Sequence, residues 1–255
     1  MEGFLNRGTL PEILEHSRDA GVSRLITIGT EPEDWKVNHD LSTKFSEEIH
    51  YTVGLHPNHV DGSWENYLAD LPSYFSQETK PVAVGEIGLD YFRLPKEERK
   101  ALPMKSNQRA AFRHQLALAK ELGLPVVVHC RSAFADCVAE IDDSGVEWCK
   151  VVFHCFADGP NEMRQLMERG GRGSFTGIVT FGNAENVREA ALLQGLEKLM
   201  IETDSPYLAP IPFRGKSNEP AYLPHIGAYL SKVFGEEEEK LAGIITRNTL
   251  DFYCL

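Results

Sequence analysis

Seven strand-like segments alternate with helical patterns along the 255 residues, and this alternation limits the fold more than any other feature of the chain. Most of the strand-like segments are nearly continuous apolar runs, which is typical of parallel strands covered on both faces. The pattern therefore predicts an α/β protein with a parallel sheet. The predicted strands are residues 23–30, 51–57, 82–90, 125–130, 151–155, 173–179 and 198–204.

Apolar residues at helical spacing separate these strands, and glycines at several of the ends supply stop signals. The predicted helices are residues 9–20, 112–119, 160–167, 187–191, 221–231 and 236–246. The polar stretch at 93–108 has no clear apolar face, so we expect a loop there, beside the functional site.

Strand and helix pairs of this number and length predict one domain over residues 1–255, a TIM-type (β/α)8 barrel, which typically takes about 250 residues. An open doubly wound sheet is the alternative, but no GxGxxG or P-loop motif supports it. An eighth strand should precede the helix at 9–20. We therefore expect the first strand to be missing, or to be formed poorly by residues 3–5, and a late start codon or a truncated sequence is the leading explanation.

The formal net charge of −12, from 26 basic and 38 acidic residues, argues against a protein that coats nucleic acid through a broad basic face. It leaves room for a local basic pocket. Neither a membrane-spanning apolar run nor a signal peptide is visible, so a cytoplasmic protein is predicted. The five cysteines form no CxxC pair, which makes a structural zinc site of the finger type improbable and favours reduced thiols.

Metal-ligand residue types stand at the carboxyl ends of four predicted strands, where the active sites of such barrels lie. They are Glu86, His129, His154 and Asp204. A single histidine at a strand end is more often a hydrogen-bonded structural residue. Burying all four without a cation would be costly, however, so together they predict a metal site.

The ligand types suit one or two divalent ions, since imidazole favours zinc or manganese and carboxylates favour magnesium or manganese. A bridging carboxylate with separate histidines would hold two ions about 3.5–4 Å apart, an arrangement used for phosphoester cleavage. Asp204 could also take a proton from the attacking water, so Asp204 and Glu86 are the predicted catalytic residues. Glu202 has the same strand parity as Asp204 and is interpreted as a core or supporting residue.

Positive groups near the same strand ends suit phosphate oxygens. Arg131 follows the fourth strand, and Arg214 and Lys216 lie in a loop rich in proline and glycine, so these three are predicted to bind substrate. His56 in GLHPN could be a metal ligand, a phosphate donor or a turn residue, and phosphate contact is favoured. An aromatic side chain at 91–92 could stack a base.

Seven motifs in one order now resemble the TatD family of metal-dependent deoxyribonucleases. Each motif alone is modest, but the ordered set is highly specific, and the resemblance runs from about residue 9 to the C-terminus. The motifs are GLHP (54–57), VGEIGLDY (84–91), PVVVHCR (125–131), FHCF (153–156), IETDSPYLAP (201–210), RGKSNEP (214–220) and RNT (247–249).

The resemblance implies a TIM barrel of the amidohydrolase type that holds divalent ions through the four strand-end residues. It implies hydrolysis of DNA phosphodiester bonds by metal-activated water, with an exonuclease as the expected mode and single-stranded DNA or frayed ends as the partner. His56, Arg131 and the loop at 214–218 match positions that lie near the substrate in the family. The oligomeric state stays open.

One departure from the family pattern bears on activity. Many members carry a His-x-His on the first strand that adds metal ligands, and this chain has no His-x-His. Two alternatives therefore stay open beside a deoxyribonuclease. The chain could be a metal-dependent hydrolase of a small phosphoester or an amide, because a barrel does not fix its reaction, or it could be an inactive, truncated barrel.

Overall fold

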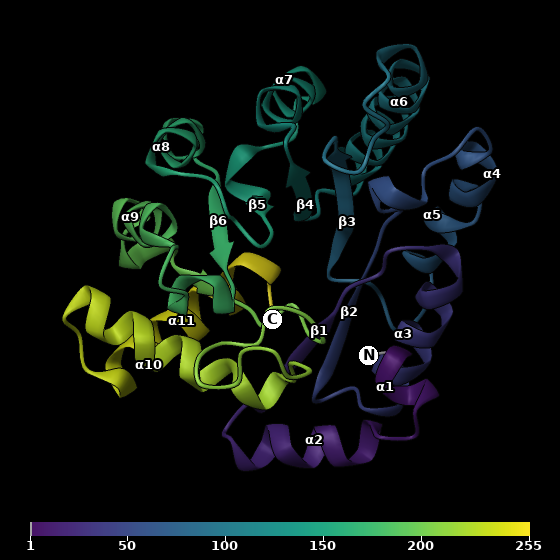
Figure 1. The fold of residues 1–255 in the computed structure, drawn as a ribbon. Helices are drawn as coiled ribbons and strands as arrows, with labels where there is room; N and C mark the ends of the chain where they lie inside the picture. Colours follow the sequence, from purple (N-terminus) through teal and green to yellow (C-terminus); the bar gives the residue numbers. More distant parts are fainter. Residues whose placement is uncertain (1) are drawn as a thin grey trace. The chain divides into compact units, whose positions relative to one another are not determined.

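The structure is a computed structural model that describes residues 2–255, and its strands follow one another in the sheet in chain order from β1 to β7 (Figure 1). All seven predicted strands are present, although most are shorter than predicted. Their bounds are β1 Leu25–Thr27, β2 Ile49–Val53, β3 Ala83–Asp90, β4 Val126–Arg131, β5 Val151–Phe153, β6 Arg172–Phe175 and β7 Met200–Ile201.

Helices connect these strands, as the alternating pattern predicts (Figure 1). None of those within residues 2–255 is long and apolar enough to cross a lipid bilayer. Their bounds are α1 Glu2–Asn6, α2 Leu10–Asp19, α3 Pro32–Lys44, α4 Trp64–Leu68, α5 Leu71–Tyr74, α6 Glu98–Leu122, α7 Phe134–Ser144, α8 Pro160–Arg169, α9 Glu185–Gln194, α10 Leu223–Phe234 and α11 Glu238–Tyr253.

The expectation of a loop at 93–108 is wrong, and the structure decides between the two alternatives for the first strand. Residues 3–5 lie in the helix α1 and do not form it, and the described residues 2–255 agree with a missing first strand, since no strand precedes β1 there. The stretch 93–108 is largely helical, because α6 begins at Glu98 and continues through Pro103. The charged side chains at 96–100 are exposed, while Ala101 and Gln108 are buried and supply the inward face that the sequence pattern concealed.

The chain divides into two compact units, which are described separately. The central unit comprises residues 26–152, and the terminal unit comprises residues 3–25 and 153–255. In the central unit, α6 packs on β3, and α7 packs on β3 and β4. Its core includes the fully buried side chains of Tyr51, Ile87, Phe112 and Ile141. Burial of about 25 cal/mol per Å² of apolar surface is the main force that holds such layers together.

The pairing of β3 with β4 contains an irregularity that lies at a predicted site residue. Val84 pairs with Val126 and Ile87 with Val128, so β3 has one residue more than β4 between these two pairs. Bulges of this kind redirect side chains and are common beside functional sites. Glu86 lies within the irregular stretch, and its orientation is therefore set by the bulge as well as by strand alternation.

Gly88 permits the close approach of β3 to β4 at the level of His129. Its φ is +144°, and a Cβ at this position would lie 2.0 Å from the carbonyl oxygen of His129. We expect Gly88→Ala to lower the free energy of unfolding by at least about 3 kcal/mol, because strain and overpacking add. Gly62→Ala is the control, since a Cβ there meets no atom within 4 Å. Equal urea-unfolding midpoints for the two variants would contradict this account.

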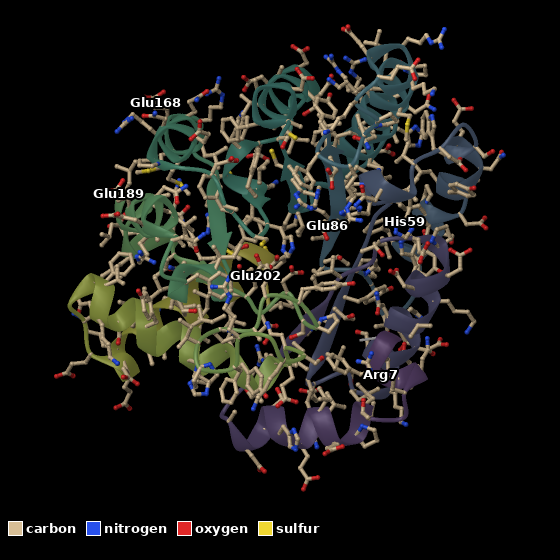
Figure 2. The ribbon with its side chains drawn as sticks, in the orientation of Figure 1. Arg7, His59, Glu86, Glu168, Glu189 and Glu202 are labelled. Carbon is tan, nitrogen blue, oxygen red and sulfur yellow. The ribbon has the colours of Figure 1, made fainter. Side chains whose placement is uncertain are left out.

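In the terminal unit, β6 and β7 are parallel and pair through Ser174 with Met200 and Phe175 with Ile201. Helix α8 packs on α9 and β6, while α11 packs on β7 and α10. The core of this unit contains four buried phenylalanines, namely Phe153, Phe156, Phe175 and Phe181. The exposed Glu168 and Glu189 point outward from α8 and α9, so acidic residues of this kind contribute net charge on the helix surfaces (Figure 2).

Candidate metal centre

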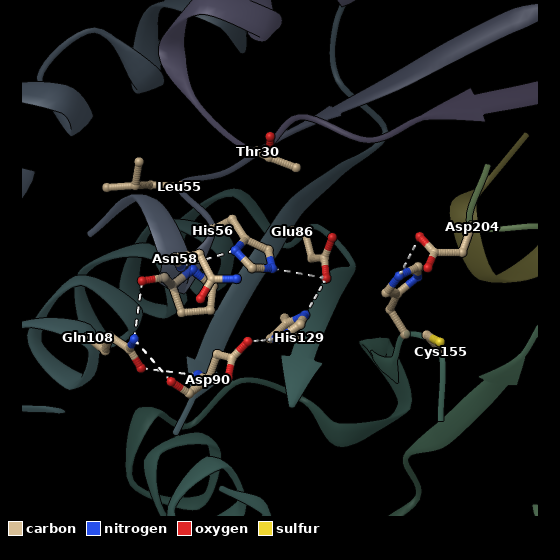
Figure 3. A network of polar contacts seen from close by, with 12 residues as sticks. Thr30, Leu55, His56, Asn58, Glu86, Asp90, Gln108, His129, Cys155 and Asp204 are labelled. Carbon is tan, nitrogen blue, oxygen red and sulfur yellow. Dashed lines mark hydrogen bonds and ion pairs between the residues drawn. The ribbon is translucent and has the colours of Figure 1, made fainter. Parts of the chain in front are cut away.

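The central unit brings Glu86 and His129 together with a second carboxylate at the ends of β3 and β4 (Figure 3). The Nδ1 atom of His129 lies 2.8 Å from Oε1 of Glu86, and its Nε2 atom lies 3.3 Å from Oδ2 of Asp90. Asp90 is almost fully buried. One imidazole is thus held between two carboxylates, which is how proteins fix the ring orientation of a metal-binding histidine.

The two carboxylates control the charge of His129. Burial lowers the pKa of His129, but the hydrogen bonds and charges of Asp90 and Glu86 outweigh burial and raise it to about 9. The same pairing lowers the pKa of Asp90 against the effect of its own burial. The metal-free centre therefore holds an imidazolium at neutral pH, and a metal ion that binds Nδ1 must replace its proton.

This shift makes the stability of the metal-free protein depend on pH. The pKa of His129 is about 9 in the folded state against 6.5 ordinarily, so the stabilisation is complete below pH 6.5 and is lost as the pH rises through 9. The shift corresponds to a loss of about 3 kcal/mol. Urea unfolding in a chelator between pH 6.5 and 9 tests this. The His129→Gln variant should lack this part of the dependence, and an unchanged slope in that variant would refute the assignment.

His56 also lies beside Glu86, but its hydrogen bonds favour a donor over a ligand. Suitable atoms of His56, Glu86 and His129 lie within 4.8 Å of one another, which is compatible with a shared ion. However, Nδ1 of His56 accepts the backbone N–H of Asn58 at 3.1 Å. Burial also lowers the pKa of His56 to about 4, so the ring is neutral and its proton is on Nε2. That Nε2–H faces Oε1 of Glu86 at 3.6 Å and can donate, whereas binding a metal through Nε2 would require the other tautomer and the loss of the Asn58 contact.

Gln108 of α6 fixes the strand end that carries Asp90 (Figure 3). Its Oε1 accepts the backbone N–H of Asp90 at 3.0 Å, and its Nε2 donates to the carbonyls of Asp90 and Pro57. The side chain is buried. One amide therefore ties the loop that carries His56 to the end of β3.

The terminal unit brings His154 and Asp204 together, again with a second carboxylate. Nδ1 of His154 lies 2.5 Å from Oε2 of Glu202, and Nε2 lies 3.5 Å from Oδ1 of Asp204. Glu202 also accepts the backbone N–H of Cys155 and the hydroxyl of Ser174. Burial raises the pKa of Glu202, but His154 and these donors outweigh burial and lower it. The ionised Glu202 thus accepts the Nδ1–H of His154 and fixes the ring, with Nε2 directed at Asp204.

A tight loop positions Asp204 after β7. The φ of Asp204 is +56°, a left-handed conformation that Asp and Asn tolerate better than most residues. The fully buried Asn218 closes the loop, because its Nδ2 donates to the carbonyls of Thr203 and Tyr207 at 2.6 Å each. The neighbouring Cys155 has its pKa raised by burial to about 12, so it is not a thiolate at neutral pH.

The three basic residues predicted to bind substrate each lie over an aromatic ring in their own unit. The guanidinium of Arg131 lies 4.0 Å from the ring centroid of Phe92 in the central unit. In the terminal unit, Arg214 lies 4.1 Å from the ring of Phe181, and Lys216 lies 5.7 Å from that of Phe213. All three are exposed, and their contact with substrate stays a prediction.

The structure places each member of the predicted ligand set against one other member. Glu86 meets His129 in the central unit, and His154 meets Asp204 in the terminal unit. The set of four as one centre stays a prediction. Of the four supporting residues, Glu202 was interpreted from its strand parity as a core or supporting residue, and the other three were given no role. Strand parity could also have indicated Asp90, whereas no local signal marked Gln108 or Asn218.

Comparisons with known proteins identify the family of the chain. Residues 4–254 match the family described as TatD related DNase. The metal-dependent hydrolase YcfH of Escherichia coli is 38% identical over 202 residues, which are 79% of this chain and 72% of YcfH. A protein named 3'-5' ssDNA/RNA exonuclease TatD, from Pantoea vagans, is 31% identical over 96% of this chain and 93% of its own.

A solved structure shows the same fold. YjjV, a TatD homologue from Escherichia coli, superposes with a TM-score of 0.88 and 25% identity over 97% of this chain and 93% of its own. This confirms the predicted TIM-type α/β fold. With that fold, the family match and the relatives named as metal-dependent hydrolases place the chain in the class of metal-dependent hydrolases. The chain belongs to the TatD family of related DNases.

Glu202 should matter for metal binding although we do not place it among the ligands. In Glu202→Gln, an amide replaces the carboxylate that holds the Nδ1 proton of His154, so we expect metal affinity to fall about 10- to 100-fold. Titration with Mn²⁺ against a chelating dye measures this. Glu185→Gln, an exposed change on α9, is the control. Equal affinities of the two variants would show that Glu202 does not orient the ligand.

Proposed function

We propose that the protein hydrolyses phosphodiester bonds of DNA, as an exonuclease acting on single strands or unpaired ends. One observation carries the proposal. In each unit, a histidine predicted to bind metal has one ring nitrogen held by a buried or half-buried carboxylate and the other directed at a predicted ligand carboxylate. Family membership and a relative that bears an exonuclease name support the same reaction.

Glu86, His129, His154 and Asp204 are the proposed metal ligands, through Nδ1 of His129 and Nε2 of His154. Asp90 and Glu202 hold the opposite ring nitrogens, so each ring directs its remaining nitrogen at a ligand carboxylate and can bind an ion there once that nitrogen is deprotonated. The donor set of two imidazoles and two carboxylates fits one or two ions of Mg²⁺, Mn²⁺ or Zn²⁺. When bound, such ions polarise phosphoryl oxygens and promote the formation of a nucleophile from water.

The other proposed roles follow from charge and hydrogen-bonding capacity. Asp204 takes the proton from the attacking water, while Glu86 positions it. Arg131, Arg214 and Lys216 bind phosphate oxygens of the strand. The Nε2–H of His56 donates to a phosphate oxygen, a role that its neutral state and its contact with Asn58 support.

The test is hydrolysis of an end-labelled single-stranded oligonucleotide by the purified chain in EDTA, Mg²⁺, Mn²⁺ or Zn²⁺. A duplex of the same sequence, bis(p-nitrophenyl) phosphate and a p-nitroanilide amide are assayed in parallel. We expect metal-dependent, stepwise shortening of the single strand from its 3′ end. If the folded, metal-loaded protein cleaves only the small phosphodiester or the amide, the proposed DNA substrate is wrong and a small molecule is the substrate. No cleavage of any substrate would contradict the proposed hydrolysis.

A further inference from the structure

A large aromatic ring stands exposed directly after the strand that carries Glu86. Phe92 follows the end of β3, and 63% of its surface is accessible. The guanidinium of Arg131 lies 4.0 Å from the ring centroid. Single exposed apolar residues are common in proteins, so exposure alone assigns no role to Phe92. A role is indicated by the contacts that connect Phe92 to the candidate metal centre.

Hydrogen bonds fix the backbone positions that carry the ring and the guanidinium. Oδ1 of Asp90 accepts the backbone N–H of Phe92 at 3.0 Å. The N–H of Tyr91 donates to the carbonyl of Arg131 at 2.9 Å, and Asp90 pairs with Arg131 in the strand register. The ends of β3 and β4 therefore place both side chains, and neither depends on a long loop.

The same contacts place this pair beside a proposed metal ligand. Oδ2 of Asp90 contacts Nε2 of His129, so one buried carboxylate holds both the ligand and the backbone of Phe92. His129 and Arg131 lie two residues apart on β4, with side chains on one face and about 7 Å between them along the strand. A substrate phosphate near His129 is therefore within one nucleotide of Arg131 and its ring.

We propose that Phe92 is a stacking platform for an unpaired base of the substrate, next to a phosphate that Arg131 binds. This inference rests on the proposed function and names its substrate class as single-stranded nucleic acid. Arg131 covers one face of the ring, and the exposed remainder offers a second face to a base. Every base has such a face, so stacking tolerates any sequence. Inside a duplex the faces are already stacked, so duplex DNA binds poorly.

The overall charge of the protein supports a contact of this kind. A net charge of −12 disfavours binding that relies on long-range attraction of phosphates. Stacking on Phe92 does not depend on charge, so its contribution persists when salt screens the phosphates. Arg131 should account for part of the salt dependence, about 0.7 in the slope of log affinity against log salt for each phosphate it neutralises.

The first experiment compares substitutions at Phe92 in the Mn²⁺-loaded chain. We expect Phe92→Leu to raise KM for a single-stranded oligonucleotide about 5- to 100-fold, mainly through KM and much less through kcat. Phe92→Trp should restore KM because it restores a ring. Leu102→Ala, at a comparably exposed apolar residue of α6, is the control and should leave KM unaffected.

The second experiment removes the base instead of the ring. Nuclease-resistant phosphorothioate oligonucleotides with one abasic site, moved stepwise from the 3′ end, are titrated by fluorescence anisotropy. At one position, the abasic site should weaken binding to the wild type but not to Phe92→Leu. Equal losses in both proteins, or wild-type KM in Phe92→Leu, would overturn the platform while DNA hydrolysis stands. Binding that depends on the Phe92 ring, without hydrolysis, would refute the proposed nuclease activity but support the stacking platform. No oligonucleotide binding at all would refute the stacking platform as well.

Discussion

The Asp204→Asn variant should remain folded and lose about 10²- to 10⁴-fold in hydrolysis of single-stranded DNA. The amide cannot accept a proton from the attacking water and is a weaker metal ligand than a carboxylate. The fold should survive for a specific reason. Asp204 adopts a left-handed conformation, and asparagine is among the residues that tolerate it best. The contact of the Asp204 carbonyl with the N–H of Tyr207 does not involve the side chain and is kept.

The measurement pairs kcat with a thermal melt and with metal content. Asp251→Asn, an exposed change on α11 in the same unit, controls for the loss of one negative charge. A variant at Asp204 that keeps near-normal kcat would refute its assignment as the base. A variant that is inactive and also unfolds at a much lower temperature than the wild type would show that the carboxylate supports the loop instead.

Metal affinity should rise about 100-fold between pH 6.5 and 8.5. His129 has its pKa raised to about 9 in the metal-free protein, and a metal ion binds only the deprotonated ring. Each pH unit below 9 therefore lowers the apparent affinity about tenfold, and binding releases close to one proton from this ring. Calorimetric titration with Mn²⁺ in buffers of different ionisation enthalpy measures the affinity and the released proton together.

Asp90→Asn provides the matched variant for this pH dependence. The amide oxygen can still accept the N–H of Phe92, but the charge that stabilises the imidazolium of His129 is gone. The pKa of His129 then falls, and the affinity should depend less steeply on pH. A flat affinity profile in the wild type, or an unchanged slope in Asp90→Asn, would show that His129 is not protonated as its contacts indicate.

The sequence allowed the strands to be predicted well because their apolar runs are dense and end sharply. The segment at 125–130 is an example, since β4 occupies Val126–Arg131. Helix α6 was missed at its beginning because Pro103 and a run of charged side chains conceal a face with only a few buried residues. The helix α1 at residues 2–6 was missed because five residues carry too little periodicity.

The site residues at strand ends could be predicted from the sequence. Residues that act through hydrogen bonds to distant parts of the chain were harder to predict. Glu86 and His129 follow from alternation and topology. The tautomer of His56 does not, because it depends on a backbone N–H two residues away. Asn218 supports the turn at Asp204 from 14 positions along the chain, which only the folded loop reveals.

Gln108 limits how the central unit can change over evolution. The side chain at this position must supply an oxygen that accepts the N–H of Asp90. It must also supply an N–H group that donates to the carbonyls of Asp90 and Pro57. Glutamate would lack the donors, and asparagine would fall short by one methylene. Most positions on this polar helix are exposed and tolerate substitution. A substitution of Gln108 would instead disturb the backbone at Pro57 and Asp90, and through it both His56 and His129. The segment that resembles an expendable insertion thus contains one of the least replaceable positions in the unit.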